Sequence, residues 1–277
     1  MARIVAIALQ DRLKRTVIVD NKPGASTIVG AEFVARSPPD GNTLLLTTES
    51  TLSTNPSLYA KLPYTTSDFV PISMVVDMPM VLVAGTKVKA NNVAQVIELA
   101  RCNPGESTFA SIGSGSPQHL SMELFNRMSG GRMTHVPYRG GSPAMSDLAG
   151  GQVDYFYAAI GTAVPFISSG RMKAIALTGA KHSPLLPGVP TISEAGLPGY
   201  ESSVWLGLLG PSGMSKEKVS QLEAEIAQIA KSPQLLATWN KMGVIPVGNT
   251  SIEFAEKIRS DADKWGKLIR ESGIKPE

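Results

Sequence analysis

The sequence predicts an α/β protein, because short apolar runs typical of buried strands alternate with longer runs that have helical periodicity. The β-branched segment TVIVD (16–20) is followed by IVGAEFVARS (28–37), whose apolar residues recur at helical spacing, and then by the apolar run TLLLTT (43–48). Alternation of this kind is typical of parallel or mixed sheets flanked by helices. With 277 residues, the chain is long enough for one large or two medium domains.

The first third of the chain is predicted to begin with a helix. Its buried face is expected to consist of four apolar residues, Ile4, Ile7, Leu9 and Leu13. Two further apolar runs, 71–76 and 80–85, are predicted as strands, and Asn92 is placed to cap the helix that follows them.

A second series of strands and helices begins at residue 108. A strand at 108–113 is predicted to lead into a helix at 117–129. The series continues with strands at 134–139, 153–160 and 173–179, a short helix capped by Ser142, and a helix at 162–168. The stretch 181–201, with four prolines and three glycines, is expected to be an irregular surface segment.

The last part of the chain is predicted to hold a strand at 203–211 and three helices. Their start signals are Ser215, Ser232 with Pro233, and a capping box of Thr250 and Glu253. Because these helices bring almost no strands of their own, their apolar faces must pack on an earlier layer. We therefore expect two lobes, residues 1–103 plus 204–277 and residues 104–203, whose two chain crossings create a hinge and a cleft.

The composition argues against several classes of protein. A net charge of +3 without long Lys/Arg runs argues against nucleic-acid binding. The single cysteine, Cys102, excludes an intramolecular disulfide, and the three histidines are too far apart in sequence for a local metal motif, so we expect no metal and no cofactor. No apolar run approaches the roughly 20 residues of a membrane span, and the first residues make a poor signal peptide.

The segment SIGSGSPQHL (111–120) is the main candidate site. Ser116 as the N-cap and Pro117 at the first helical position would leave backbone N–H groups at the positive end of a helix. Ser111 and Ser114 and the amides of Gly113 and Gly115 could converge there on an anion the size of a carboxylate. His119, in the first helical turn, is expected to be neutral. Equally, Ser116 could cap the helix and nothing more, with His119 packed beneath the loop.

Two catalytic or nucleotide-binding interpretations fit this segment poorly. Ser114 with His119 as a base would suit a hydrolase, but the G-x-S-x-G elbow is absent. The dinucleotide motif G-x-G-x-x-G fails because Gln118 stands in place of the third glycine. Elsewhere, Asp154 opens an otherwise apolar strand, where it could bind a ligand or cap a neighbouring loop, and we favour the structural role.

The chain resembles the Bug proteins, the periplasmic solute receptors of tripartite tricarboxylate transporters (TctC-type). The matching segments are VIVDNKPGAS, VARSPPDGNTLL, NPSLYAKLPY, DFVPIS, SIGSGSPQHL, HVPYRGGSPAMSDLAGGQVD, GRMKAIALTG, LPGVPTISEAGLPGYE and WLGLLGPSG. They cover nearly the whole chain in the expected order, and the ordered set is highly specific.

The resemblance implies a two-lobed, type II (Venus-flytrap) periplasmic binding protein that closes over a small organic acid, without catalysis. The residues that match the ligand-binding loop of the second lobe are Ser111, Gly113, Ser114, Gly115, Ser116 and His119. Thr48 and Ser50 match a cleft-lining position of the first lobe, and the stretch after Asp154 is expected to face the cleft.

The resemblance also implies partners and a location. We expect a periplasmic monomer that delivers its carboxylate to membrane permease subunits. A ligand-sensing protein for a signalling partner needs the same cleft and stays open as an alternative.

The family pattern begins with a signal peptide, a first strand and a glycine-rich loop, and only then the helix whose AR matches Ala2 and Arg3. The sequence therefore resembles a family member truncated at its N-terminus, without the loop that supplies half of the carboxylate grip. We expect such a lobe to be less stable, or to pair its unpaired strand with another chain.

Overall fold

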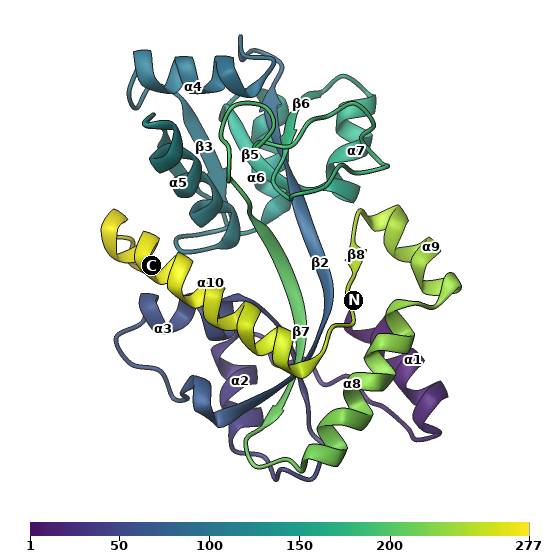
Figure 1. Ribbon diagram of the computed structural model, residues 1–277. Coiled ribbons are helices and arrows are strands. Elements are labelled where there is room, and N and C mark those ends of the chain that lie inside the picture. Colours follow the sequence, from purple (N-terminus) through teal and green to yellow (C-terminus); the bar gives the residue numbers. More distant parts are fainter. Residues whose placement is uncertain (277) are drawn as a thin grey trace. The chain divides into compact units, whose positions relative to one another are not determined.

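The computed structural model describes residues 1–276, which form two compact units (Figure 1). Unit 1 comprises Met1–Asp77, Trp205–Trp239 and Ile245–Lys267; unit 2 comprises Met78–Val204, Asn240–Val244 and the residues from Leu268 onward. The units divide within one long strand, β2 (Phe69–Gly85), where the sequence predicts two strands separated by residues 77–79. The lobe limits drawn at residues 103 and 203 stay a prediction.

Unit 1 is built from helices around short antiparallel strand pairs. It contains all or most of α1 (Ala2–Leu13), η1 (Ala25–Thr27), α2 (Ile28–Ala35), β1 (Leu45–Thr48), η2 (Ser50–Thr54), α3 (Asn55–Leu58), η3 (Thr66–Asp68), β2, β7 (Ser203–Pro211), α8 (Lys216–Ala230), α9 (Pro233–Met242), β8 (Ile245–Pro246) and α10 (Ser251–Ser272). β1 pairs with β7, placing Leu45 opposite Leu209, and β8 pairs with β2, placing Pro246 opposite Val76.

The core of unit 1 centres on Trp205 of β7. Its ring packs edge-to-face on Phe254 of α10, with ring centroids 5.1 Å apart, and its indole Nε1 donates a hydrogen bond of 2.7 Å to Asp261 Oδ2. Gly207, two residues along β7, lies against the same Phe254: a Cβ built there would be 2.0 Å from the Phe254 ring. Glycine at this position lets the helix approach the strand closely.

One prediction for unit 1 is wrong and another is wrong in part. Residues 16–20 form no strand, and Ile18 is 83% exposed. A β-branched run gains from strand geometry only when its backbone has a partner, and no strand of the described residues pairs with it. The first helix exists, but it buries Val5, Ala6 and Leu9 and leaves Ile7 exposed.

Unit 2 is a mixed sheet flanked by helices (Figure 1). Its elements are the second half of β2, α4 (Val93–Cys102), β3 (Thr108–Ser111), α5 (Pro117–Ser129), β4 (Thr134–Pro137), α6 (Gly141–Gly150), β5 (Tyr155–Ala159), α7 (Ile160–Ser168) and β6 (Met172–Leu177). β3 is parallel to β4 and β5, and β2 is antiparallel to β5 and β6.

Alternate residues of this sheet belong to two different core clusters. Leu82, Phe109 and Tyr157 belong to the cluster that includes α4 and α5. Val83, Ala110 and Phe156, each next in sequence to one of those residues, belong to the cluster that includes α6 and α7. Because side chains alternate across a strand, the sheet has helices on both faces, and the predicted α/β class is confirmed.

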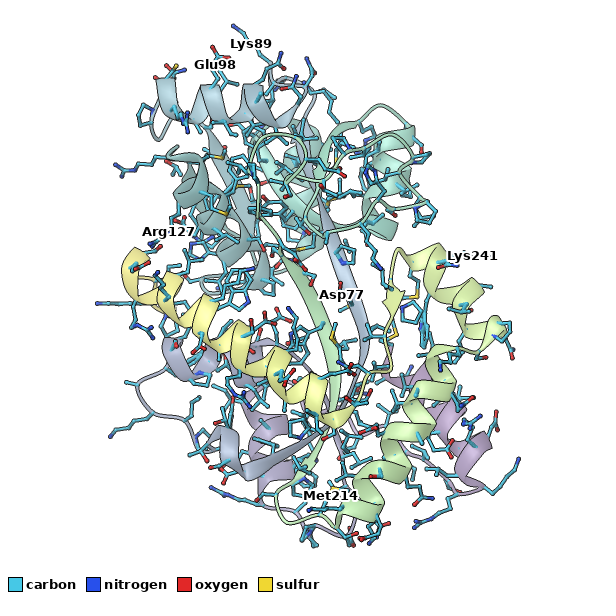
Figure 2. The ribbon with its side chains drawn as sticks, viewed as in Figure 1. Asp77, Lys89, Glu98, Arg127, Met214 and Lys241 are labelled. Atoms are coloured by element: carbon cyan, nitrogen blue, oxygen red, sulfur yellow. The ribbon has the colours of Figure 1, made fainter. Side chains whose placement is uncertain are left out.

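Local start signals place several helices as the sequence predicts. α5 spans the predicted residues, Asn92 and Ser215 accept hydrogen bonds from backbone N–H groups of the helices they cap, and Thr250 with Glu253 forms the reciprocal pair of a capping box. The outer faces of α4 and α5 carry exposed charges such as Glu98 and Arg127 (Figure 2). No helix within the described residues has the length and apolar character that crossing a membrane requires.

Candidate functional site

The candidate site of unit 2 lies where β3 ends and α5 begins, and we call residues 111–116 the Ser111 loop. β3 is parallel to both of its neighbours, and the carboxyl ends of parallel strands are where α/β sheets commonly bind ligands. Ser116 is the N-cap of α5 with extended backbone, its Oγ accepts a hydrogen bond from His119 N, and Pro117 takes the first helical position. The predicted strand, cap and helix are therefore present.

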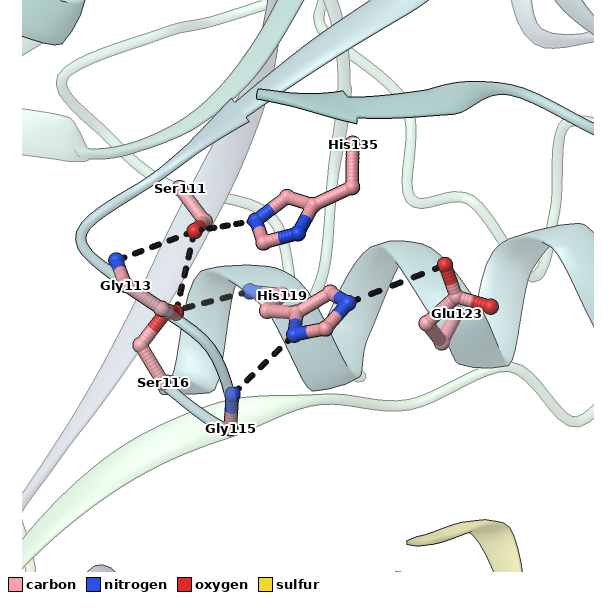
Figure 3. A network of polar contacts seen from close by, with 7 residues as sticks. All are labelled: Ser111, Gly113, Gly115, Ser116, His119, Glu123 and His135. Atoms are coloured by element: carbon pink, nitrogen blue, oxygen red, sulfur yellow. Dashed lines mark hydrogen bonds and ion pairs between the residues drawn. The ribbon is translucent and has the colours of Figure 1, made fainter. Parts of the chain in front are cut away.

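Polar contacts within the Ser111 loop fix its shape (Figure 3). The N–H of Gly113 donates to Ser111 Oγ at 3.0 Å, and the Gly113 carbonyl accepts from Ser116 Oγ at 2.6 Å. The N–H of Gly115 donates to His119 Nδ1 at 3.0 Å. Gly113 has a φ of 121°, and a Cβ there would touch nothing within 4 Å, so this position requires glycine for its backbone conformation rather than for space.

Two stacked imidazoles lie beneath the loop. The rings of His119 and His135 are 3.8 Å apart between centroids and 8° from parallel, and the ring of Phe109 lies near both, 5.1 Å from His135 and 6.0 Å from His119 between centroids. Burial, and secondarily the neighbouring His135, lower the pKa of His119 to about 4. His119 is therefore neutral at pH 7, as the sequence predicts.

The contacts of His119 also assign its tautomer. Nδ1 accepts the hydrogen bond from Gly115, so the neutral ring carries its proton on Nε2. That nitrogen lies 3.9 Å from Glu123 Oε1, one turn along α5, and burial raises the pKa of the Glu123 carboxyl. His119 thus acts as an acceptor that holds the loop, beyond packing beneath it.

Asp154 does not lie with the Ser111 loop. Its Oδ2 accepts hydrogen bonds from Thr108 N at 2.8 Å and from Thr108 Oγ1 at 3.0 Å. Thr108 begins β3 and Asp154 immediately precedes β5, so both lie at the amino ends of parallel strands, at the opposite edge of the sheet from Ser111. Of the two roles left open, the structure favours the structural one.

Ser142 is not the cap of the following helix, contrary to the prediction. α6 begins at Gly141, and its N-cap is Gly140, with a φ of 119° and no side-chain cap. The two glycines ahead of Ser142 start the helix earlier than the hydroxyl signal indicates.

Thr48 and Ser50 belong to unit 1. Thr48 ends β1 opposite Leu206, and Ser50 begins η2, with both side chains partly buried. Between them lies Glu49, only 3% exposed, whose Oε2 has no hydrogen-bond partner among the described residues. Burial raises the pKa of Glu49 to about 8, so its carboxyl is mostly protonated at neutral pH.

Sequence reasoning missed two residues of these regions, His135 and Glu49. His135 is brought to Ser111 by the pairing of β4 with β3, and its Nε2 lies 2.6 Å from Ser111 Oγ. The only signal in the sequence was its place in the quoted segment HVPYRGG. Glu49 follows an apolar strand next to a predicted site residue, and its burial follows from tertiary packing alone.

The contacts give the hydrolase alternative no support. His119 Nδ1 is occupied by the Gly115 amide, and Ser111, whose hydroxyl contacts the imidazole of His135, is fully buried. Across residues 1–276, no three His, Cys, Asp or Glu side chains gather as metal ligands would. What the loop offers is the positive end of α5, held in place by the internal hydrogen bonds of the loop.

Solved structures similar to this chain include periplasmic binding proteins and proteins with bound dicarboxylic acids. One, Rpa4515 of R. palustris with adipate, is 31% identical, has a TM-score of 0.87, and matches 100% of this chain and 93% of that one. Another, MatC (Rpa3494) of Rhodopseudomonas palustris with bound malate, is 28% identical with a TM-score of 0.81, over 97% of this chain and 92% of that one. A third, the periplasmic binding protein BugD, is 32% identical with a TM-score of 0.82, over 100% and 93%.

Residues 1–274 match the tripartite tricarboxylate transporter family receptors, TctC. Protein BugT of Bordetella pertussis is 34% identical over 277 residues, covering 99% of this chain and 85% of that protein. The chain belongs to this receptor family, and the resemblance seen in the sequence is confirmed.

Proposed function

We propose that this chain is a solute receptor that binds a small organic acid through its carboxylate and serves a tripartite tricarboxylate-type transporter. The observation that carries the proposal is the Ser111 loop at the start of α5, in a member of a family whose solved relatives hold adipate and malate. The N-terminus of this 13-residue helix suits an anion, and the internal hydrogen bonds of Gly113, Gly115 and Ser116 hold the loop in front of it.

The proposal gives each site residue a role. Ser116 caps α5, Gly113 and Gly115 supply the backbone turns, and His119 holds Gly115 from below, which together shape the loop for a carboxylate. Thr48 and Ser50 of unit 1 are proposed as further ligand contacts. Asp154 is not, because its carboxylate is already used by Thr108.

The receptor is proposed to act in the periplasm, as a monomer, without catalysis, and to deliver its ligand to permease subunits in the membrane. Family membership supports the location and the partner. The sensing alternative uses the same site, so copurification with permease subunits rather than with a signalling protein distinguishes the two roles.

A thermal-shift screen of carboxylic acids, followed by calorimetric titration, tests the binding proposal. A ligand that binds the folded state stabilises it by mass action, so adipate, malate and other small acids should raise the melting temperature in order of affinity. No shift with any acid would contradict the proposal.

The site itself is tested with Gly113→Ala against a matched control, Gly170→Ala. Both glycines have positive φ, 121° and 70°, and neither has an atom within 4 Å of a built Cβ, so each substitution adds backbone strain without a steric clash, with more strain at Gly113, whose φ lies outside the left-handed helical region. We expect both variants to fold, with at least tenfold weaker acid binding for Gly113→Ala only. Equal affinities in the two variants would remove the Ser111 loop from the site.

A further inference from the structure

His135 lies at the centre of the contacts beneath the Ser111 loop. It sits on β4 opposite Phe109 of β3, and its ring stacks on that of His119 and lies 5.1 Å from that of Phe109 between centroids. Its Nε2 is 2.6 Å from Ser111 Oγ (Figure 3). A single side chain thus touches both the first residue of the loop and the ring that supports the loop from α5.

Two chains of contacts run from His135 to the two glycines of the loop. Through its hydrogen bond, it reaches Ser111, whose hydroxyl accepts from the Gly113 N–H. Through its stacked ring, it reaches His119, whose Nδ1 accepts from the Gly115 N–H. Both glycines have positive φ, so their orientation depends on these contacts more than on local preference.

The hydrogens around Ser111 can be assigned by counting donors. Its Oγ accepts from Gly113 N, lies 3.0 Å from the Gly113 carbonyl oxygen and 2.6 Å from His135 Nε2, and it has one proton. All three contacts are satisfied when His135 donates from Nε2 and the hydroxyl donates to the carbonyl. In that arrangement His135 carries its proton on Nε2.

We propose that His135 is a positioning residue of the carboxylate site, holding the Ser111 loop in its binding shape by donating from Nε2 to Ser111 and by stacking on His119. The proposal rests on the proposed function, since the loop it shapes is the proposed carboxylate site. His135 is absent from the residues that the loop pattern in the sequence singles out.

Substitutions of His135 separate the hydrogen bond from the ring stack. His135→Phe keeps a ring to stack on His119 but removes the donor, and should weaken acid binding at least tenfold. His135→Gln places an amide donor near the position of Nε2 and should stay within about threefold of the unsubstituted protein. His182→Gln, an exposed histidine of the same unit with a 58% exposed side chain, is the control and should leave affinity unchanged.

A double-mutant cycle tests whether His135 acts through Ser111. Ser111→Ala should weaken binding by the same factor as His135→Phe, and the double variant should be no weaker than either single variant within twofold. Multiplying losses would mean that the two residues act independently, and would overturn the proposal. The Ser111→Ala measurement also decides the matter if His135→Phe does not fold.

Nuclear magnetic resonance of the ligand-free protein tests the same proposal without any acid. The ring ¹⁵N shifts should show His135 protonated on Nε2, and His135→Phe should speed amide exchange at Gly113 and Gly115 at least tenfold. An Nδ1–H tautomer or unchanged exchange overturns the positioning role. Failure of every acid to bind, with these signatures present, overturns the proposed function instead.

Discussion

Replacing His119 by Asn should remove a specific part of the pH dependence of stability. Burial lowers the pKa of His119 from its usual 6.5 to about 4, so between these values the unfolded chain holds a proton that the folded protein excludes. Stability must then fall as the pH drops from 6.5 towards 4 and level off below. Integrated from pH 7.5 to pH 4.5, the loss through this residue is about 2.5 kcal/mol.

The variant keeps the hydrogen bond and discards the titration. Asn Oδ1 occupies the position of His Nδ1 and can still accept from the Gly115 N–H, but it does not ionise. Urea unfolding followed by circular dichroism at pH 7.5 and pH 4.5 gives the free energy of unfolding. The difference in this free energy between the unsubstituted protein and His119→Asn should change by about 2.5 kcal/mol from one pH to the other. His182→Asn is the control for an exposed ring. A free-energy difference between these two proteins that stays constant with pH would refute the reasoning, as would a His119 that titrates above pH 6 by nuclear magnetic resonance.

Three further substitutions have defined outcomes. Burial raises the pKa of Glu49 to about 8, so the free energy of unfolding should fall as the pH rises from 4.5 through that value, by about 2 kcal/mol between pH 6 and pH 8. Glu49→Gln should abolish this fall, as measured by urea unfolding at the two pH values. Gly207→Ala should lower the free energy of unfolding by roughly 1–3 kcal/mol, because its Cβ would lie 2.0 Å from the Phe254 ring. The control is Gly150→Ala, whose Cβ would meet open space and which should lower the free energy of unfolding by less than half as much in the same assay. Asp154→Ala should lower the melting temperature through two lost hydrogen bonds yet leave acid affinity unchanged; a tenfold weaker affinity would return Asp154 to the site.

The elements that the sequence predicts correctly are those with signals within a few residues of one another. Ser116 followed by Pro117 marks the start of α5, and Thr250 with Glu253 marks the start of α10, because capping is satisfied within one helical turn. Residues 16–20 carry an equally clear strand pattern, but a strand depends on a partner that local sequence does not supply.

The candidate site was predictable on the same terms. The Ser111 loop follows from glycines, serines and a proline in one short segment, and the structure places it between a parallel strand and a helix as expected. His135 lies 24 residues from Ser111 and reaches it only through the pairing of β3 with β4. Burial of Glu49 likewise depends on packing from distant parts of the chain, which no local pattern reports.

The core around Trp205 has a practical consequence for measurement. All three tryptophans, Trp205, Trp239 and Trp265, belong to unit 1, so tryptophan emission, excited at a wavelength that tyrosine does not absorb, reports on that unit. Histidines 119, 135 and 182 all belong to unit 2, so imidazole resonances report on the other one. The sequence thus carries two separate spectroscopic probes, one for each unit. If the unfolding transitions followed by tryptophan emission and by imidazole resonances coincide, the two units unfold as one cooperative body.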